Sequence, residues 1–133
     1  MLSGGRGHRL AEGRRLIDQG ISNTLVISDG FDPEWVEAGR LCTSGGAICF
    51  TPDPYSTRGE ARWIAQEARE RGWDSLVVVT STYHVRRTRM IVGSCFDGEL
   101  AVVGARPPLG NRIIGVAWEW PKSAYYLTLN RGC

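Results

Sequence analysis

The 133-residue sequence predicts a single α/β domain, with residues 1–133 folding as a three-layer α/β/α sandwich around an open parallel sheet. Short, β-branched apolar runs alternate with amphipathic segments along the whole chain. The connections are short, and strict alternation of this kind produces crossover helices and parallel strands. A closed barrel would need about 250 residues. The sequence therefore predicts a Rossmann-like sheet of about five strands, of which the first, ending near Ser3, is truncated.

The first half of the chain contains two complete strands between helices. Apolar residues recur at helical spacing over residues 8–19 and a glycine follows, which predicts a helix. Residues 24–27 form a short buried strand that ends in a polar loop. Residues 33–41 suit a second helix with proline in its first turn. Residues 47–50 predict another strand, because the prolines that follow cannot continue a ladder.

The second half repeats this alternation. A helix is expected from Ser56 or Thr57 to Arg71, with Gly72 beyond its end. The remaining predicted elements are a strand at 76–79, an arginine-rich helix that ends near Cys95, a strand at 100–103, and a terminal helix at 112–130 that is interrupted near Pro121.

Composition narrows the class of protein. The net charge of +2 comes from scattered charges, which argues against a nucleic-acid partner. No apolar run is long enough to span a bilayer, so the chain is expected to be cytoplasmic, or else the soluble domain of a membrane-anchored protein. The cysteines lack metal-ligand spacing, so no metal is expected. We expect three buried small hydrophobic residues and one incidental terminal thiol at Cys42, Cys49, Cys95 and Cys133.

The carboxyl ends of the strands are where an open parallel sheet binds its ligands. The richest loop there is Thr80 to Arg87, which combines hydroxyl groups with the start of a helix, the ingredients of an anion site. His84 and Arg87 are three residues apart and can share one helix face. A phosphate or carboxylate could bind there, with His84 transferring protons. The alternative is that Ser81 or Thr82 only caps the helix and that His84 is structural.

Other loops contribute further candidates. Gly4 and Gly5 allow close backbone approach to a ligand but do not match the dinucleotide fingerprint, so no cofactor is assigned. Ser28, Asp29 and Gly30 either add polar groups to the same rim or form a tight turn. Thr57 and Glu60 have the spacing of a capping box, although Glu60 could also act as a base. Glu119 and Lys122 have the spacing of a surface pair.

Taken in order, these residues resemble a known signature. It comprises Gly4-Gly5, Arg9-Leu10, Ser28-Asp29-Gly30, Ser56-Thr57 with Glu60-Ala61, Thr80-Ser81-x-Tyr83-His84-x-x-Arg87 and Glu119-x-x-Lys122. The pattern is similar to the YdcF/SanA/ElyC-like domain family. That resemblance implies a Rossmann-like sandwich whose motif residues line one pocket, and a link to bacterial envelope homeostasis. The sequence departs from the pattern in its short first strand, in Asp29, and in the position of Glu60.

Two functional hypotheses follow. The first is a small hydrolase or transferase that acts on a phosphorylated or nucleotide-like molecule. In it Gly4, Gly5, Ser81 and Thr82 bind the anion, Arg9 and Arg87 neutralise its charge, and His84 is the general acid or base. The second is a non-catalytic module that binds a nucleotide or a lipid-linked phosphate.

Overall fold

The computed structural model describes residues 7–28, 36–106, 116, 119, 121–122, 124–125 and 132–133. Within these residues the chain is a mixed α/β structure with parallel strands, as the sequence predicted. The end of the expected first strand and most of the expected terminal helix lie outside the described residues.

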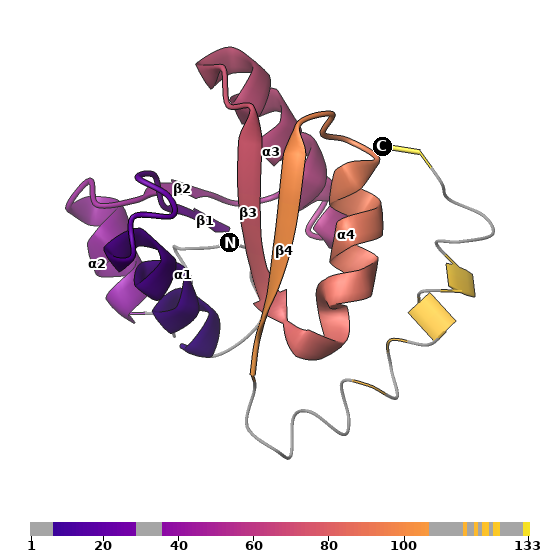
Figure 1. Ribbon diagram of the computed structural model, residues 1–133, viewed down its shortest axis with the longest axis horizontal. Helices are drawn as coiled ribbons and strands as arrows, with labels where there is room; N and C mark the ends of the chain where they lie inside the picture. The colour runs from indigo at the N-terminus through magenta and orange to yellow at the C-terminus, as the bar shows by residue number, and fades with distance from the viewer. Residues whose placement is uncertain are drawn as a thin grey trace.

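Helices and strands alternate along the described chain (Figure 1). The first four elements are α1 (His8–Asp18), β1 (Val26–Ser28), α2 (Val36–Thr43) and β2 (Ile48–Phe50). They are followed by α3 (Thr57–Arg71), β3 (Ser75–Ser81), the short 3₁₀ helix η1 (Thr82–His84), α4 (Val85–Gly93) and β4 (Glu99–Ala105).

The start of α3 corrects one prediction. Ser56 is the N-cap, and its hydroxyl oxygen accepts a hydrogen bond from the Gly59 backbone N–H at 3.2 Å. Thr57 and Glu60 therefore do not form the expected capping box, and Glu60 is buried instead. Gly59 is required here, because a Cβ atom at this position would lie 2.0 Å from the Pro54 carbonyl oxygen. The preceding loop can thus pack directly on the first turn of α3.

The strands form two parallel pairs rather than one continuous sheet of five. Three residue pairs join β1 to β2, from Val26 opposite Ile48 to Ser28 opposite Phe50. Seven residue pairs join β3 to β4. The expectation of a five-stranded sheet is not met within the described residues, because none of their strands pairs with both β1 and β3.

Two hydrophobic clusters place helices on both sides of the strands. One contains Val26 and Val78 together with Ile64 of α3 and Val92 of α4. The other cluster contains strand residues whose side chains point to the opposite side, together with residues of α1 and α2. Its buried members are Leu10, Leu16, Ile27, Ala38, Val79 and Ala105. Since β1 and β3 contribute to both clusters, the two strand pairs share the same helix layers. Helices α3 and α4 therefore pack with one cluster of strand residues, and α1 and α2 pack with the other.

All four cysteines form disulfides, contrary to the expectation of free thiols. Cys42 of α2 is bonded to Cys49 of β2, and Cys95 after α4 is bonded to Cys133. The first bond closes a short loop within the β1–β2 region. The second, helped by a 2.8 Å hydrogen bond from Arg62 Nε to the Cys133 carbonyl oxygen, joins α3 and α4 to the end of the chain. Tertiary proximity, which cysteine spacing does not reveal, determines both pairings.

Candidate functional site

Two serines occupy the carboxyl ends of parallel strands, as the sequence analysis anticipated. Ser28 is the last residue of β1 and Ser81 is the last residue of β3. Both are fully buried. The Ser28 hydroxyl donates a 2.6 Å hydrogen bond to Glu60 Oε1, which holds this carboxylate of α3 against the end of β1. A buried carboxylate with a charge-assisted hydrogen bond is thereby fixed at the strand ends.

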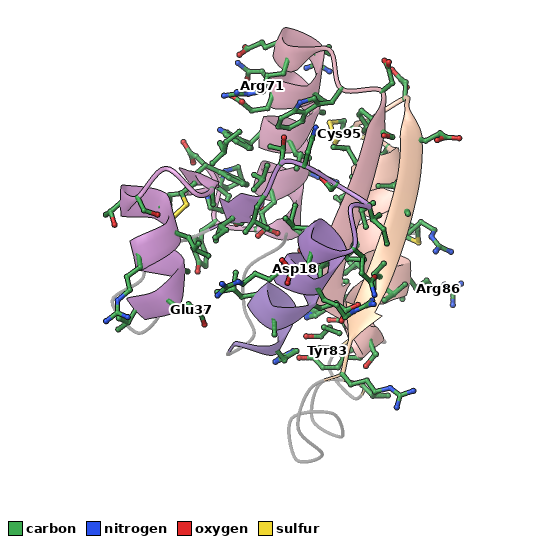
Figure 2. The ribbon with its side chains drawn as sticks, turned by 60° about the vertical axis from the view of Figure 1, so that its left-hand side comes forward. Asp18, Glu37, Arg71, Tyr83, Arg86 and Cys95 are labelled. Carbon is green, nitrogen blue, oxygen red and sulfur yellow. A yellow bond between two sulfur atoms is a disulfide. The ribbon has the colours of Figure 1, made fainter. Side chains whose placement is uncertain are left out.

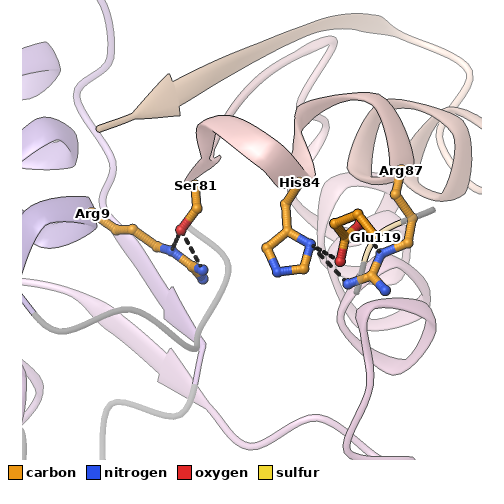
Figure 3. Close-up of polar contacts among 5 residues, drawn as sticks. All are labelled: Arg9, Ser81, His84, Arg87 and Glu119. Carbon is orange, nitrogen blue, oxygen red and sulfur yellow. Dashed lines mark hydrogen bonds and ion pairs between the residues drawn. The ribbon is translucent and has the colours of Figure 1, made fainter. Parts of the chain in front are cut away.

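Arg9 of α1 reaches across to the end of β3 (Figure 3). Its Nε and Nη2 atoms donate to Ser81 Oγ at 3.1 and 2.8 Å, and only 1% of its surface is exposed. Burial lowers the pKa of this guanidinium, while its interactions with Tyr83 and with the Glu60 carboxylate act in the opposite direction. Arg9 therefore lies between the Ser28–Glu60 pair and the segment that follows β3.

His84, Arg87 and Glu119 form the second part of the cluster. His84 Nδ1 lies 2.9 Å from Glu119 Oε1 and 2.9 Å from Arg87 Nη2. One ring nitrogen cannot donate and accept at once, so the two contacts compete for the same position. We assign the proton to Nδ1, because an unprotonated Nδ1 would direct its lone pair at the carboxylate. This assignment leaves Nε2 as the unprotonated, basic nitrogen.

The protonation of this cluster follows from its burial and charge. Burial, followed by the charges of Arg87, Arg9 and Lys122, lowers the pKa of His84 to about 3. Burial also raises the pKa of Glu119, against the influence of Arg87 and Lys122. At neutral pH the imidazole is therefore neutral, and its contact with Glu119 is a hydrogen bond rather than an ion pair. Such a histidine is unprotonated near neutral pH, and it becomes an effective base only when a bound anion offsets the nearby positive charges.

Arg87 is incompletely satisfied in this arrangement. Its Nε lies 3.4 Å from Glu119 Oε2, yet both atoms are buried and neither has a hydrogen-bond partner among the described residues. Its Nη2 faces the ring nitrogen to which we assign a proton. A guanidinium with unused donors is a natural ligand for an additional anionic oxygen.

The other predicted residues are placed as follows. Thr80 is buried within β3, Thr82 is exposed at the start of η1, and Thr57 is half-buried at the start of α3. In the part of the chain that the structure describes, no hydrogen bond joins their side chains to the cluster. Gly4, Gly5, Asp29 and Gly30 lie outside the described residues.

Glu119 and Tyr83 belong to the cluster but were not among the predicted site residues. Glu119 was interpreted as half of a surface pair because Lys122 follows it at helical spacing, yet only 7% of its surface is exposed. Tyr83 interacts with Arg9 and packs against His84, with ring centroids 4.6 Å apart. The family-like signature contained both residues and was the one signal in the sequence that pointed to them.

No protein-family model matches this chain, and no curated protein or solved structure is significantly similar to it. The residues that the structure describes contain no group of three or more His, Cys, Asp or Glu side chains suited to a metal ion. Among the helices of those same residues, none combines the length and apolar character needed to cross a membrane.

Proposed function

We propose that this cluster binds a phosphorylated or nucleotide-like anion, and that the chain is a small hydrolase or transferase acting on it. The observation that carries the proposal is the placement of two buried guanidinium groups, Arg9 and Arg87, on either side of His84 beyond the end of β3 (Figure 3). Burying two cations is costly unless their charge is used, and an anionic ligand would use it.

The charge of the cluster supports an anion rather than a cation. Arg9, Arg87 and the exposed Lys122 are cationic, while Glu60 and Glu119 supply two carboxylates. With a neutral imidazole, the net charge remains positive. Any protonation of Glu119, whose pKa is raised, would make the cluster still more positive.

The proposed chemistry assigns one task to each side chain. Arg87 and Arg9 neutralise the ligand and the charge that develops on it during transfer. His84 Nε2 acts as general base and removes the proton of an attacking hydroxyl or water. Glu119 holds the ring through Nδ1, so it is a positioning residue. Glu60 and Ser28 fix the opposite side of the site through their mutual hydrogen bond.

The resemblance to YdcF/SanA/ElyC-like domains supports the same assignment, since the clustered residues are those of its signature. We also propose that the chain works in an oxidising compartment, as an envelope-linked role would require. Two disulfides favour such a compartment over the cytoplasm that the sequence analysis expected.

A non-catalytic binding module is the second candidate. Contacts within the cluster favour this candidate, because many of its polar groups already have partners. Ser81 accepts hydrogen bonds from Arg9, and Glu119 contacts both His84 and Arg87. A module of this kind would use the unsatisfied donors of Arg87 to hold the ligand and would leave it unchanged.

Thermal unfolding with inorganic phosphate, pyrophosphate, nucleotides and isoprenoid phosphates tests the proposal. A ligand at about 100 times its dissociation constant should raise the Tm by several degrees. Arg87→Gln should lose this shift. Arg86→Gln is the matched control, because Arg86 is exposed on the same helix and its side chain projects from the surface (Figure 2).

Catalysis is tested separately on any ligand that binds. His84→Ala should abolish turnover while affinity changes by less than about tenfold. Binding without turnover in the parent chain would establish the binding module instead. If none of these anions shifts the Tm of the parent chain, both candidate functions are wrong.

A further inference from the structure

Ser81 occupies the position of a helix cap, but its hydroxyl does not cap the helix. It directly precedes η1 and has the extended backbone of an N-cap residue, with φ −69° and ψ 148°, yet its side chain makes no capping hydrogen bond. Serine at this position ordinarily uses its oxygen for such a bond. The Ser81 hydroxyl is instead directed at other groups, and these come from the first residues of α1.

The hydrogen-bond partners of Ser81 Oγ determine where its proton lies. Arg9 Nε and Nη2 donate to this oxygen at 3.1 and 2.8 Å and so occupy its two lone pairs. The remaining partner of Oγ among the described residues is His8 Nε2, at 3.4 Å. Because Oγ has no third lone pair to offer, Ser81 must be the donor in the contact with His8. The hydroxyl proton therefore points at His8 Nε2, and the neutral ring carries its own proton on Nδ1.

This arrangement contains the components of an activated nucleophile. His8 Nε2 is positioned to take the proton of Ser81, and the Arg9 guanidinium would stabilise the alkoxide that is left. The distance of 3.4 Å is long for a hydrogen bond, as catalytic contacts often are before a substrate binds. The other strand-end serine, Ser28, instead donates its proton to a carboxylate, that of Glu60, at 2.6 Å. Ser81 is thus the better placed of the two serines for attack on a ligand.

The second histidine of the chain faces the same space as Ser81. In Figure 3 the side chains of Ser81 and His84 project to the same side of η1, between the guanidinium groups of Arg9 and Arg87. Ser81 and Arg9 are buried, whereas both histidines are only partly buried. A phosphoryl group would therefore approach Oγ from the side of the histidines, and bulk water is kept from the oxygen until it does.

We propose that Ser81 is the nucleophile of this site and that His8 is its base, so that phosphoryl transfer proceeds through a phosphoserine intermediate. The inference rests on the proposed function, because it names the covalent step of the same reaction. It also gives a role to His8, which was not among the predicted site residues. His84 then serves the second half of the reaction.

The reaction has two balanced steps. In the first, Ser81 Oγ attacks phosphorus while His8 Nε2 takes the hydroxyl proton; the bond to the leaving oxygen breaks, its electron pair stays on that oxygen, and His8 passes the proton to it. In the second, water or an acceptor alcohol attacks the phosphoserine and His84 Nε2 takes its proton. The bond between phosphorus and Oγ breaks, and the proton returns to Oγ. The phosphoserine is itself the anion that offsets the cations around His84.

Acid quenching of the full chain during reaction with p-nitrophenyl phosphate tests the proposal. The leaving group of this probe needs no proton, so the probe isolates the first step. Peptide fragmentation in a mass spectrometer should place one phosphoryl group on Ser81 and none on Ser28. His8→Ala should slow the formation of this phosphoserine by about 100-fold or more, and added imidazole should restore part of the rate.

Substitution of the nucleophile provides a second test. Ser81→Ala should form no phosphoenzyme, while the matched control Ser94→Ala, which removes a hydroxyl at the end of α4, should react like the parent chain. Ser81→Ala leaves two Arg9 donors without their acceptor, and this variant can fail to fold. Oxygen exchange between inorganic phosphate and water in the parent chain then replaces it, because such exchange requires reversible formation of a phosphoserine.

The outcomes distinguish this inference from the function on which it rests. Turnover of p-nitrophenyl phosphate without a phosphoenzyme and without oxygen exchange would keep the proposed function and overturn the inference, since water would then attack directly. A phosphoryl group on Ser28, or an unchanged rate in His8→Ala, would also overturn it. Phosphate binding with neither turnover nor exchange would establish the binding module and exclude the nucleophile. If the parent chain neither binds phosphate nor reacts with the probe, both proposals are wrong.

Discussion

The two ends of β1 and β3 are built in opposite ways. At the carboxyl ends, polar side chains from α1, α3 and the segment after β3 close the space between the strands, through contacts such as Arg9 to Ser81 and Ser28 to Glu60. At the amino ends, the same strands border a cavity of about 480 Å³ with a single described charge. Figure 2 shows Arg71, next to the amino end of β3, and Tyr83, just past its carboxyl end, far apart. One end is closed by polar contacts, and the other borders open space lined by few charges.

The largest expected effect concerns the disulfide between Cys95, which lies shortly before β4, and Cys133. Replacing Cys95 and Cys133 together by serine releases a link that spans 38 residues and should cost about 4 kcal/mol of unfolding free energy, from the entropy of the longer closed loop. Replacing Cys42 and Cys49 releases a link that spans 7 residues and should cost about 2 kcal/mol. Denaturant unfolding of both double variants measures the order, and a reversed order would contradict it.

Removing the buried cation Arg9 should destabilise the polar contacts at the carboxyl ends of β1 and β3. Arg9→Met leaves Ser81 without its two donors and Glu60 without a nearby positive charge, and should cost about 3 kcal/mol. Arg14→Met is the control on the same helix, because Arg14 is exposed and should change stability by less than about 0.5 kcal/mol. Equal stability of the two variants in urea would show that Arg9 does not hold this end together.

Acid should weaken the same polar end through His84. Its pKa is near 6.5 in the unfolded chain and about 3 in the folded one, so below pH 6.5 the unfolded state binds a proton that the folded state does not. Stability should therefore fall by about 2 kcal/mol between pH 7.5 and pH 5. Glu119 offsets part of this loss, because its raised pKa lets the folded state bind a proton more readily.

Urea unfolding across this pH range measures the slope. His84→Gln, which cannot titrate, should flatten it. A slope that persists unchanged in His84→Gln would show that other groups produce the acid sensitivity.

The smallest expected effect compares neighbouring residues of β3. Val77 lines the cavity, so Val77→Ile adds a methylene where space exists and should stabilise the chain by up to about 0.8 kcal/mol. Val78 is 1% exposed in a filled cluster, so Val78→Ile should destabilise it by about 1 kcal/mol or more. Thermal unfolding distinguishes the two, and destabilisation by both would mean that the cavity cannot accept the methylene.

Local patterns in the sequence predicted the elements better than they predicted the contacts. The sequence predicted the helix at 57–71 and the glycine after its end, because a cap, an apolar stripe and a C-terminal glycine all act within a few residues. The polar strand ends were readable because parallel topology brings them to one edge. The ion pair of Glu119 with Arg87 and the partners of the cysteines depend on distant segments, so no local pattern contained them.

Gly104 of β4 affects the position of the turn that carries His84. A Cβ atom at Gly104 would come within 3.0 Å of Thr82 and Val85, so β4 packs directly against η1 and the start of α4. β4 contributes no side chain to the cluster, yet its packing positions the turn that carries His84. A side chain at position 104 would also press on the Cα atom of Thr82, which no substitution at 82 or 85 removes, so it would displace the turn that carries His84.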